Sequence, residues 1–223
     1  MCTELARYES DGTEVVITDD DIRNVLCKNA NVTDVEMRMF IELCRAQQLN
    51  PFIREAYLIK YGSNPATIVT GKDVFTKRAF RNPRFRGMEA GVTVVNREGR
   101  VERREGSMVG RQTEKLVGGW CRVHVDGYKV PIFDEVAFSE YSTGKSNWLS
   151  KPATMIRKVA MVHALREAFP EEFQGLYDES EMGVEVFPAA EVKAYAEPCE
   201  PVYEVEEQAS GADYVAFKEG EVF

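Results

Sequence analysis

The stretch that decides the fold spans residues 147–182 and reads NWLSKPATMIRKVAMVHALREAFPEEFQGLYDESEM. Pro152 stands where a helix can begin at little cost, because the first amide of a helix has no partner within the helix. From Pro152 to Phe169 the apolar residues recur on several sides at helical spacing. We therefore predict a helix over residues 152–169 that is packed on more than one side.

Cations interrupt this apolar helix. Arg157, Lys158 and Arg166 lie within it, and Lys151 precedes it on the same line as Lys158. A cation in a packed helix is costly unless an anion lies beside it. Phosphates of a nucleic-acid strand supply such anions, and so do the carboxylates at positions 171–179. The pattern favours phosphates and leaves intramolecular pairing open.

The net charge of −9 hides an uneven distribution of charge along the chain. Residues 1–50 hold 5 Lys and Arg against 10 Asp and Glu, residues 51–170 hold 21 against 12, and residues 171–223 hold 2 against 15. A basic middle between acidic flanks is typical of a polyanion binder whose tail moderates its affinity. A solvated surface with a solubilising tail is the alternative reading.

The length and composition predict one folded domain with flanking segments. We expect a flexible N-terminus over residues 1–18, a folded core over residues 19–182, and a mostly disordered acidic tail over residues 183–223. The 5 cysteines are scattered without a C-x-x-C pair, which argues against a zinc ribbon or a disulfide scaffold. No transmembrane run or secretory signal is apparent, so we expect no membrane association and a reducing cytoplasm.

The fold class expected from these patterns is α+β, with a small antiparallel sheet of hairpins packed against helices. It also includes an N-terminal helical segment and the disordered acidic tail. A capping box, Thr33 to Glu36, predicts the start of a helix that ends before Asn50. The other expected helices cover residues 19–29, 71–81 and 134–141, with a loop at 142–147. The expected strands cover residues 55–61, 67–70, 91–96, 100–104, 116–125 and 128–133, the last two joined at Asp126-Gly127 as a hairpin.

Catalytic patterns are scarce. His124 and His163 have no metal-ligand spacing, and no phosphate-binding G-x-x-x-x-G-K-[ST] loop occurs. His163, Arg166 and Tyr177 resemble the catalytic set of tyrosine recombinases only in residue type, without a second catalytic box. Scattered carboxylates likewise give no convincing magnesium nuclease site. We therefore expect no covalent catalysis.

Two segments together carry a family resemblance. The first is LNPFIREAY, residues 49–57, followed by the turn Gly71-x-Asp73. The second runs through Trp148-x-x-x-Pro152-x-x-Met155-x-Arg157, Ala160-Met161, Arg166-x-Ala168-Phe169 and Gly175-x-Tyr177-Asp178. The pair strongly resembles the RecT and lambda Beta family of phage single-strand annealing recombinases, over roughly residues 20–182.

The resemblance implies ATP-independent annealing of complementary DNA strands by a homo-oligomeric ring or filament, in a bacterial host and from a phage or prophage gene. It implies single-stranded DNA and an annealed duplex intermediate as ligands. It implies a companion exonuclease and the host single-strand-binding protein as partners, docked by the tail. No cofactor is required, and modulation by Mg²⁺ stays open. The alternative is a nucleic-acid-binding structural or regulatory protein that does not anneal strands.

The resemblance assigns phosphate contacts to Arg157 and Arg166, whereas the family's neighbouring lysines fall one or two positions away from Lys158 and Lys151. Trp148 is expected either to stack on a base or to anchor its loop in the core. The full set of expected DNA-binding residues is Lys72, Lys77, Arg103, Arg111, Arg122, Lys145, Trp148, Lys151, Arg157, Lys158 and Arg166.

Overall fold

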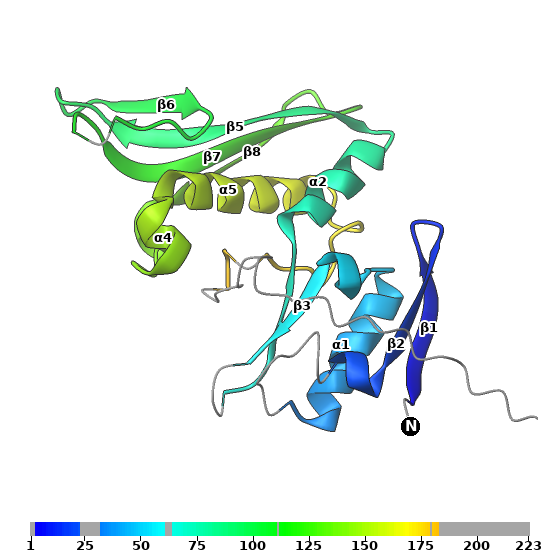
Figure 1. Ribbon diagram of the computed structural model, residues 1–223. Helices are drawn as coiled ribbons and strands as arrows, with labels where there is room; N and C mark the ends of the chain where they lie inside the picture. Colours follow the sequence, from blue (N-terminus) through cyan, green and yellow to red (C-terminus); the bar gives the residue numbers. More distant parts are fainter. Residues whose placement is uncertain (1–2, 23–31, 61–63, 111, 179, 183–223) are drawn as a thin grey trace, which may run out of the picture. The chain divides into compact units, whose positions relative to one another are not determined.

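The computed structural model describes residues 3–22, 32–60, 64–110, 112–178 and 180–182, all within one compact unit, Met1–Val186 (Figure 1). The strands are β1 (Glu4–Ser10), β2 (Thr13–Thr18), β3 (Ala56–Ile59), β4 (Thr67–Thr70), β5 (Phe85–Val95), β6 (Val101–Glu105), β7 (Lys115–Val125) and β8 (Ile132–Ala137). The helices are α1 (Asp34–Ala46), the 3-10 turn η2 (Pro51–Ile53), α2 (Lys72–Arg81), α3 (Phe138–Tyr141), α4 (Ser146–Ser150) and α5 (Pro152–Ala168).

A four-stranded antiparallel sheet in the order β6-β5-β7-β8 forms the largest layer, and α5 covers one of its faces (Figure 1). Alternate residues of the long central strands, such as Val92 and Cys121, are fully buried beneath α5. Nine residues of α5 are buried, on several sides of the helix. The predicted multi-sided packing of this helix is therefore confirmed.

The helix α5 lies directly on the backbone of β7. A methyl group added at Gly119 would lie 2.4 Å from the carbonyl oxygen of Ile156 and 3.0 Å from the amide nitrogen of Arg157. No side chain of β7 therefore separates helix from strand at this point, and only glycine permits the approach.

The predicted capping box of α1 is confirmed. The Thr33 hydroxyl accepts from the Glu36 amide, and the Glu36 carboxylate accepts from the Thr33 amide. Met37, Phe40, Ile41 and Cys44 form the buried stripe of α1. The hairpin of β3 and β4 and the turn between β5 and β6, with Gly99 at φ +78°, also follow the prediction.

The expected N-terminal helical segment is not supported by the structure. Residues 4–18, expected to be flexible, form the antiparallel hairpin of β1 and β2, and the expected helix at 19–29 lies mostly outside the described residues. Asp11 and Gly12 occupy its turn with φ +50° and +75°. This Asp-Gly pair between alternating strands is a strong hairpin signal, and Val15 and Ile17 fix the hairpin by burial in the core.

The second Asp-Gly pair, Asp126-Gly127, does not form the expected tight hairpin. Strand β8 begins at Ile132, because Pro131 has no amide hydrogen to donate to a sheet. The expected helix at 134–141 is also wrong over its first half. There Phe133 and Glu135 are exposed and Val136 is buried, which is the alternating pattern of a strand. Only α3 remains helical there, and α4 replaces the end of the expected loop at 142–147.

Among the described residues, no helix combines the length and the apolar character that crossing a membrane requires.

Candidate nucleic-acid interface

The direction of α5 is fixed by contacts at both of its ends. Its second turn lies on Gly119 of β7, and at its far end the ring of Phe169 lies 6.3 Å from that of Phe85, which pairs with Val125. The N-terminus of α5 therefore points toward the end of the sheet where β7 begins at Lys115.

The N-terminus of α5 has no side chain that caps it and no acidic residue that would repel an anion. Lys151 occupies the cap position without a side-chain capping bond, and the first turn contains no acidic residue. The helix dipole favours negative charge at such an end. Lys145 and Lys151, both exposed, bracket α4 immediately before it. No carboxylate contacts either lysine within the described ranges.

Arg157 is half-buried and held in a defined orientation. Its Nε donates to the carbonyl oxygen of Ala90 at 3.2 Å, an oxygen that also accepts the Gly106 amide at 3.0 Å. In the part of the chain that the structure describes, no carboxylate pairs with this guanidinium. Its two terminal nitrogens thus form a preorganised fork of the kind that suits a phosphate.

Lys158 has an internal anion. Its Nζ lies 3.0 Å from Oδ1 of Asp178, with the lysine side chain 14% exposed and the aspartate 0% exposed. Burial raises the pKa of Asp178, against the opposing effect of Lys158. The Thr70 amide donates to the Tyr177 carbonyl at 2.7 Å and so ties this segment to β4. For Lys158, the intramolecular pairing left open by the sequence is what the structure shows.

Arg166 is paired in the same way. Its Nη2 lies 2.6 Å from Oε1 of Glu181, and its guanidinium lies over the Tyr177 ring at 4.9 Å. His163 bridges Asp134 and Glu181, and these carboxylates raise its pKa to about 9. The segment after α5 thus places carboxylates against both Lys158 and Arg166.

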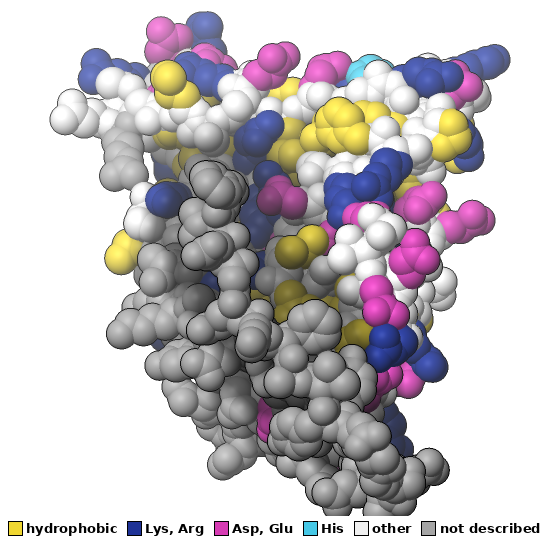
Figure 2. Space-filling model, turned by 45° about the vertical axis from the view of Figure 1, so that its right-hand side comes forward, with side chains coloured by type: hydrophobic (Ala, Val, Ile, Leu, Met, Phe, Trp, Pro, Cys, Tyr) yellow, Lys and Arg dark blue, Asp and Glu magenta, His cyan; other side chains and the backbone are white. Residues whose placement is uncertain are grey.

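The expected strand cations lie on the sheet face away from α5. Arg103 of β6 reaches across to Glu135 of β8 at 2.5 Å, and Arg122 of β7 pairs with Glu89 of β5 at 3.0 Å. Arg122 also lies near the rings of Trp120 and Phe133. Figure 2 shows this interleaving, with Lys and Arg next to Asp and Glu over the sheet at the top.

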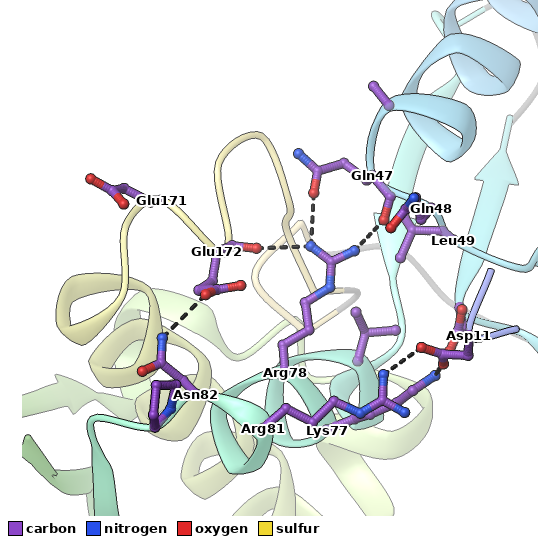
Figure 3. Close-up of a pocket in the computed structure, with 14 residues that line it drawn as sticks. Asp11, Gln47, Gln48, Leu49, Lys77, Arg78, Arg81, Asn82, Glu171 and Glu172 are labelled. Carbon is purple, nitrogen blue, oxygen red and sulfur yellow. Dashed lines mark hydrogen bonds and ion pairs between the residues drawn. The ribbon is translucent and has the colours of Figure 1, made fainter. Parts of the chain in front are cut away.

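The expected α2 cations are also paired. Lys72 lies 3.4 Å from Asp73, and Lys77 contacts Asp11 and Glu55. Lys77 lines a pocket of about 490 Å³, where Arg78 donates to the Gln47 side chain and to the Glu172 carbonyl oxygen (Figure 3). Acidic and basic side chains line this pocket together, which suits a structural junction better than an anion site.

Trp148 is 6% exposed, and its ring lies 5.9 Å from that of Phe138. An indole so deeply buried anchors α4, which is the second of the two roles considered for it. Its neighbour Leu149 is the exposed apolar residue of this helix, at 71%.

Three of the expected residues, Lys145, Lys151 and Arg157, lie before α5 or within its first two turns. Lys158 and Arg166 lie on α5 but are paired, Lys72, Lys77, Arg103 and Arg122 lie on other elements, and Arg111 is outside the described residues. Arg97 and Lys115 are two further cations outside the expected set. Both are exposed at the same end of the sheet, where Val95 pairs with Lys115.

We call five cations near this end of the sheet the basic end: Arg97, Lys115, Lys145, Lys151 and Arg157. They do not all share one face, because Lys115 pairs with Val95 on the side of the sheet away from α5, where the Thr93 hydroxyl contacts Glu135. Antiparallel pairing alone places the turn after β5 beside the start of β7, so the predicted strands already contained the signal for Arg97 and Lys115. No ion pair with a carboxylate involves these five residues in the described chain.

Comparison with known proteins agrees with the motifs. The model of the RecT family matches residues 16–194, a span that includes both motif segments. The chain belongs to the RecT family. This RecT-family chain is also 34% identical over 149 residues to the uncharacterized protein UU154 of Ureaplasma parvum serovar 3 (strain ATCC 700970). That match covers 64% of this chain and 60% of the relative, so the chain spans less than two thirds of the relative's length. The resemblance inferred from residues 49–57 and 148–178 is thereby confirmed.

Proposed function

We propose that the protein is an ATP-independent annealing protein, which holds one DNA strand by its phosphates and pairs it with a complementary strand during homologous recombination. Membership of the RecT family supports this class of activity. The observation that carries the proposal is the basic end, where the N-terminus of α5, without a side-chain cap, follows cations that have no carboxylate partner among the described residues.

Annealing needs no chemical fuel, because base pairing and stacking already favour the duplex. The barrier comes from repulsion between phosphates and from the search for the correct register. A protein that neutralises the phosphates of one strand and leaves its bases accessible lowers both. Readout of particular base edges would restrict the sequences that can be annealed, so contacts to phosphates are the ones expected.

Within this proposal the phosphate contacts are made by the basic end and not by every cation of α5. Lys158 and Arg166 have carboxylates within 3.0 Å, at Asp178 and Glu181. A phosphate would have to displace these carboxylates, whereas Arg157 and Lys151 are available without rearrangement. This division departs from the family pattern, which assigns phosphate contacts to Arg157 and Arg166 alike.

The test is sequential addition of two complementary oligonucleotides without ATP. The variant Lys151→Ala/Arg157→Ala is expected to lose strand binding and annealing. The matched control, Arg103→Ala/Arg122→Ala, removes two cations that are already paired on the far face of the sheet, and is expected to anneal normally. Circular dichroism and melting temperatures establish that both variants are folded.

Three outcomes would revise the proposal. Loss of annealing only in the control variant would place the strand on the far face of the sheet. Loss in neither variant would remove the basic end from the mechanism. Tight strand binding by the wild type without faster annealing would favour a nucleic-acid-binding protein of structural or regulatory function.

We further propose that residues 183–223 recruit a companion exonuclease or the host single-strand-binding protein. Their 10 carboxylates and interleaved aromatic residues support recognition over a simple spacer. Removing the chain after Val186 is expected to leave annealing between purified oligonucleotides intact. Complete loss of annealing in a folded truncated chain would show that the tail acts in annealing itself. Repeating the assay with and without Mg²⁺ tests whether the ion modulates the reaction.

A further inference from the structure

The loop between β7 and β8 holds a tyrosine in a fixed, half-exposed position. Tyr128 is 52% exposed, its amide donates to the Val125 carbonyl at 3.1 Å, and the Arg84 guanidinium lies 5.2 Å from its ring centre. The Asp126 amide donates to the Arg84 carbonyl at 2.7 Å, and the Arg84 guanidinium donates to the Asp126 carbonyl at 3.4 Å. These bonds join the loop to the residue before β5 in both directions, so the ring has a defined orientation.

The charge around this ring is positive. Lys129 follows the tyrosine and is exposed, and neither Lys129 nor Arg84 contacts a carboxylate among the residues that the structure places. The carboxylate of the loop, that of Asp126, is exposed, but it lies 3.3 Å from the Arg86 guanidinium. Three cations therefore lie near one carboxylate, and that carboxylate is already paired. We call Arg84, Tyr128 and Lys129 the loop surface.

Tyr177 has a similar arrangement with one difference. It is 48% exposed, and the Arg166 guanidinium lies 4.9 Å from its ring centre. That guanidinium is neutralised by Glu181 at 2.6 Å. The arginine over Tyr128 contacts no such carboxylate in the described part of the chain, so its charge is available to an external anion.

An exposed aromatic ring between uncompensated cations has the composition of a site for single-stranded nucleic acid. A base stacks on the ring or on the plane of the guanidinium, while the cations attract the phosphates on either side of that base. An isolated phosphate would use the cations and leave the ring unused. A double strand fits less well, because its bases are already stacked on each other and do not reach the ring.

We propose that the loop surface stacks on unpaired bases of a single strand, at a contact separate from the basic end. The loop follows the last residue of β7, whereas Lys115 is its first, and 11 residues of an antiparallel strand span roughly 35 Å. The basic end neutralises phosphates and the loop surface holds bases. Bases stacked there are withheld from pairing within their own strand, which keeps that strand open to its complement. The inference rests on the proposed function, because it presupposes a single-stranded ligand.

Abasic DNA separates stacking from phosphate contact, because it has the same phosphates and lacks the bases. Fluorescence anisotropy measures the affinity of the full chain for a labelled oligonucleotide and for an abasic strand of the same length, at the same low salt concentration. The wild type should bind the base-containing strand at least about fivefold more tightly, and Tyr128→Ala should lower this ratio by about fivefold. The affinity of Tyr128→Ala for the abasic strand should be that of the wild type. Tyr128→Phe should keep the wild-type ratio, because phenylalanine also stacks on bases.

Tyr177→Ala is the matched control, because it removes a tyrosine of similar exposure beneath an arginine that is already neutralised, and it should keep the wild-type ratio. Lys151→Ala/Arg157→Ala should weaken binding of both strands by the same factor and leave the ratio unchanged. Circular dichroism and melting temperatures establish that each variant is folded.

The inference is overturned if the wild type binds the two strands equally, if Tyr128→Ala keeps the wild-type ratio, or if Tyr128→Phe loses it. Equal weakening of both strands by Tyr128→Ala would also overturn it, because the loop would then contact phosphates and not bases. If Lys151→Ala/Arg157→Ala binds both strands like the wild type while Tyr128→Ala behaves as expected, the basic end is removed from the proposed function and the loop contact stands.

Discussion

Replacing Lys158 by methionine separates the two roles that a cation on α5 can have. In the structure its Nζ lies 3.0 Å from Asp178, whose side chain is completely buried. Removing one partner of a buried ion pair typically costs about 3–5 kcal/mol, because the remaining charge is left without compensation. Asp178 retains hydrogen bonds from Ser180 and can take up a proton, so we expect the lower end of that range, about 3 kcal/mol.

A second variant tests whether the lost stability comes from the uncompensated charge of Asp178. Lys158→Met/Asp178→Asn removes both charges and keeps the amide able to interact with Ser180, so it should recover most of the stability lost by Lys158→Met alone. Urea denaturation measures the free energy of unfolding of both variants. Strand affinity is then measured on folded protein as a function of salt.

For a single strand, affinity decreases with salt, and the magnitude of the slope of log affinity against log salt decreases by about 0.7 for each phosphate contact removed. The slope for Lys158→Met/Asp178→Asn should equal that of the wild type, whereas the slope for Lys151→Ala should be smaller by about 0.7. A Lys158→Met protein with wild-type stability and a reduced slope would refute the reasoning. It would show that Lys158 leaves Asp178 to bind a phosphate.

Three other predictions concern the stability of the folded protein. Gly119→Ala should destabilise the protein by roughly 1–3 kcal/mol, because the added methyl meets the backbone of α5; urea denaturation checks this, and an unchanged midpoint would contradict it. His163 has a pKa of about 9 when folded, above its value in an unfolded chain, so its stabilising contribution is complete below about pH 6.5 and is lost as the pH rises through 9. Melting temperatures from pH 6 to 10 should show this loss in the wild type and not in His163→Gln. Thr33→Ala should lower the free energy of unfolding by about 1 kcal/mol through the loss of the α1 cap, which thermal unfolding measures. An effect near zero would mean that the contact between Lys60 and Glu36 alone stabilises the N-terminus of α1.

The sequence predicted the elements whose signals are local. The capping box at Thr33 and the proline at the start of α5 are both found at the predicted positions. Two identical Asp-Gly signals had different outcomes, however. Asp11-Gly12 has strands that can pair on both sides, whereas Asp126-Gly127 is followed by Pro131, which delays the partner strand. The difference depends on residues several positions away and not on the turn itself.

The candidate site was harder to predict for a physical reason. Arg157 and Lys158 are adjacent in sequence and equal in charge, but they point to different surroundings, a carbonyl of β5 for Arg157 and a buried carboxylate for Lys158. Which cation has an internal anion depends on where the segment after α5 lies, which no local pattern specifies. Trp148 raised the same difficulty, because stacking and anchoring require the same residue in the same loop.

The contact between α5 and Gly119 has a mechanical consequence. Helices that pack through interdigitated side chains can slide past their neighbours by small shears. Here the carbonyl of Ile156 rests on strand backbone, with no intervening side chain to deform. We expect a pull on Arg157 to pass through α5 into the hydrogen-bonded strands β5 and β7, which resist shear along their length. The part of the molecule proposed to hold the strand would then deform little when the strand is pulled.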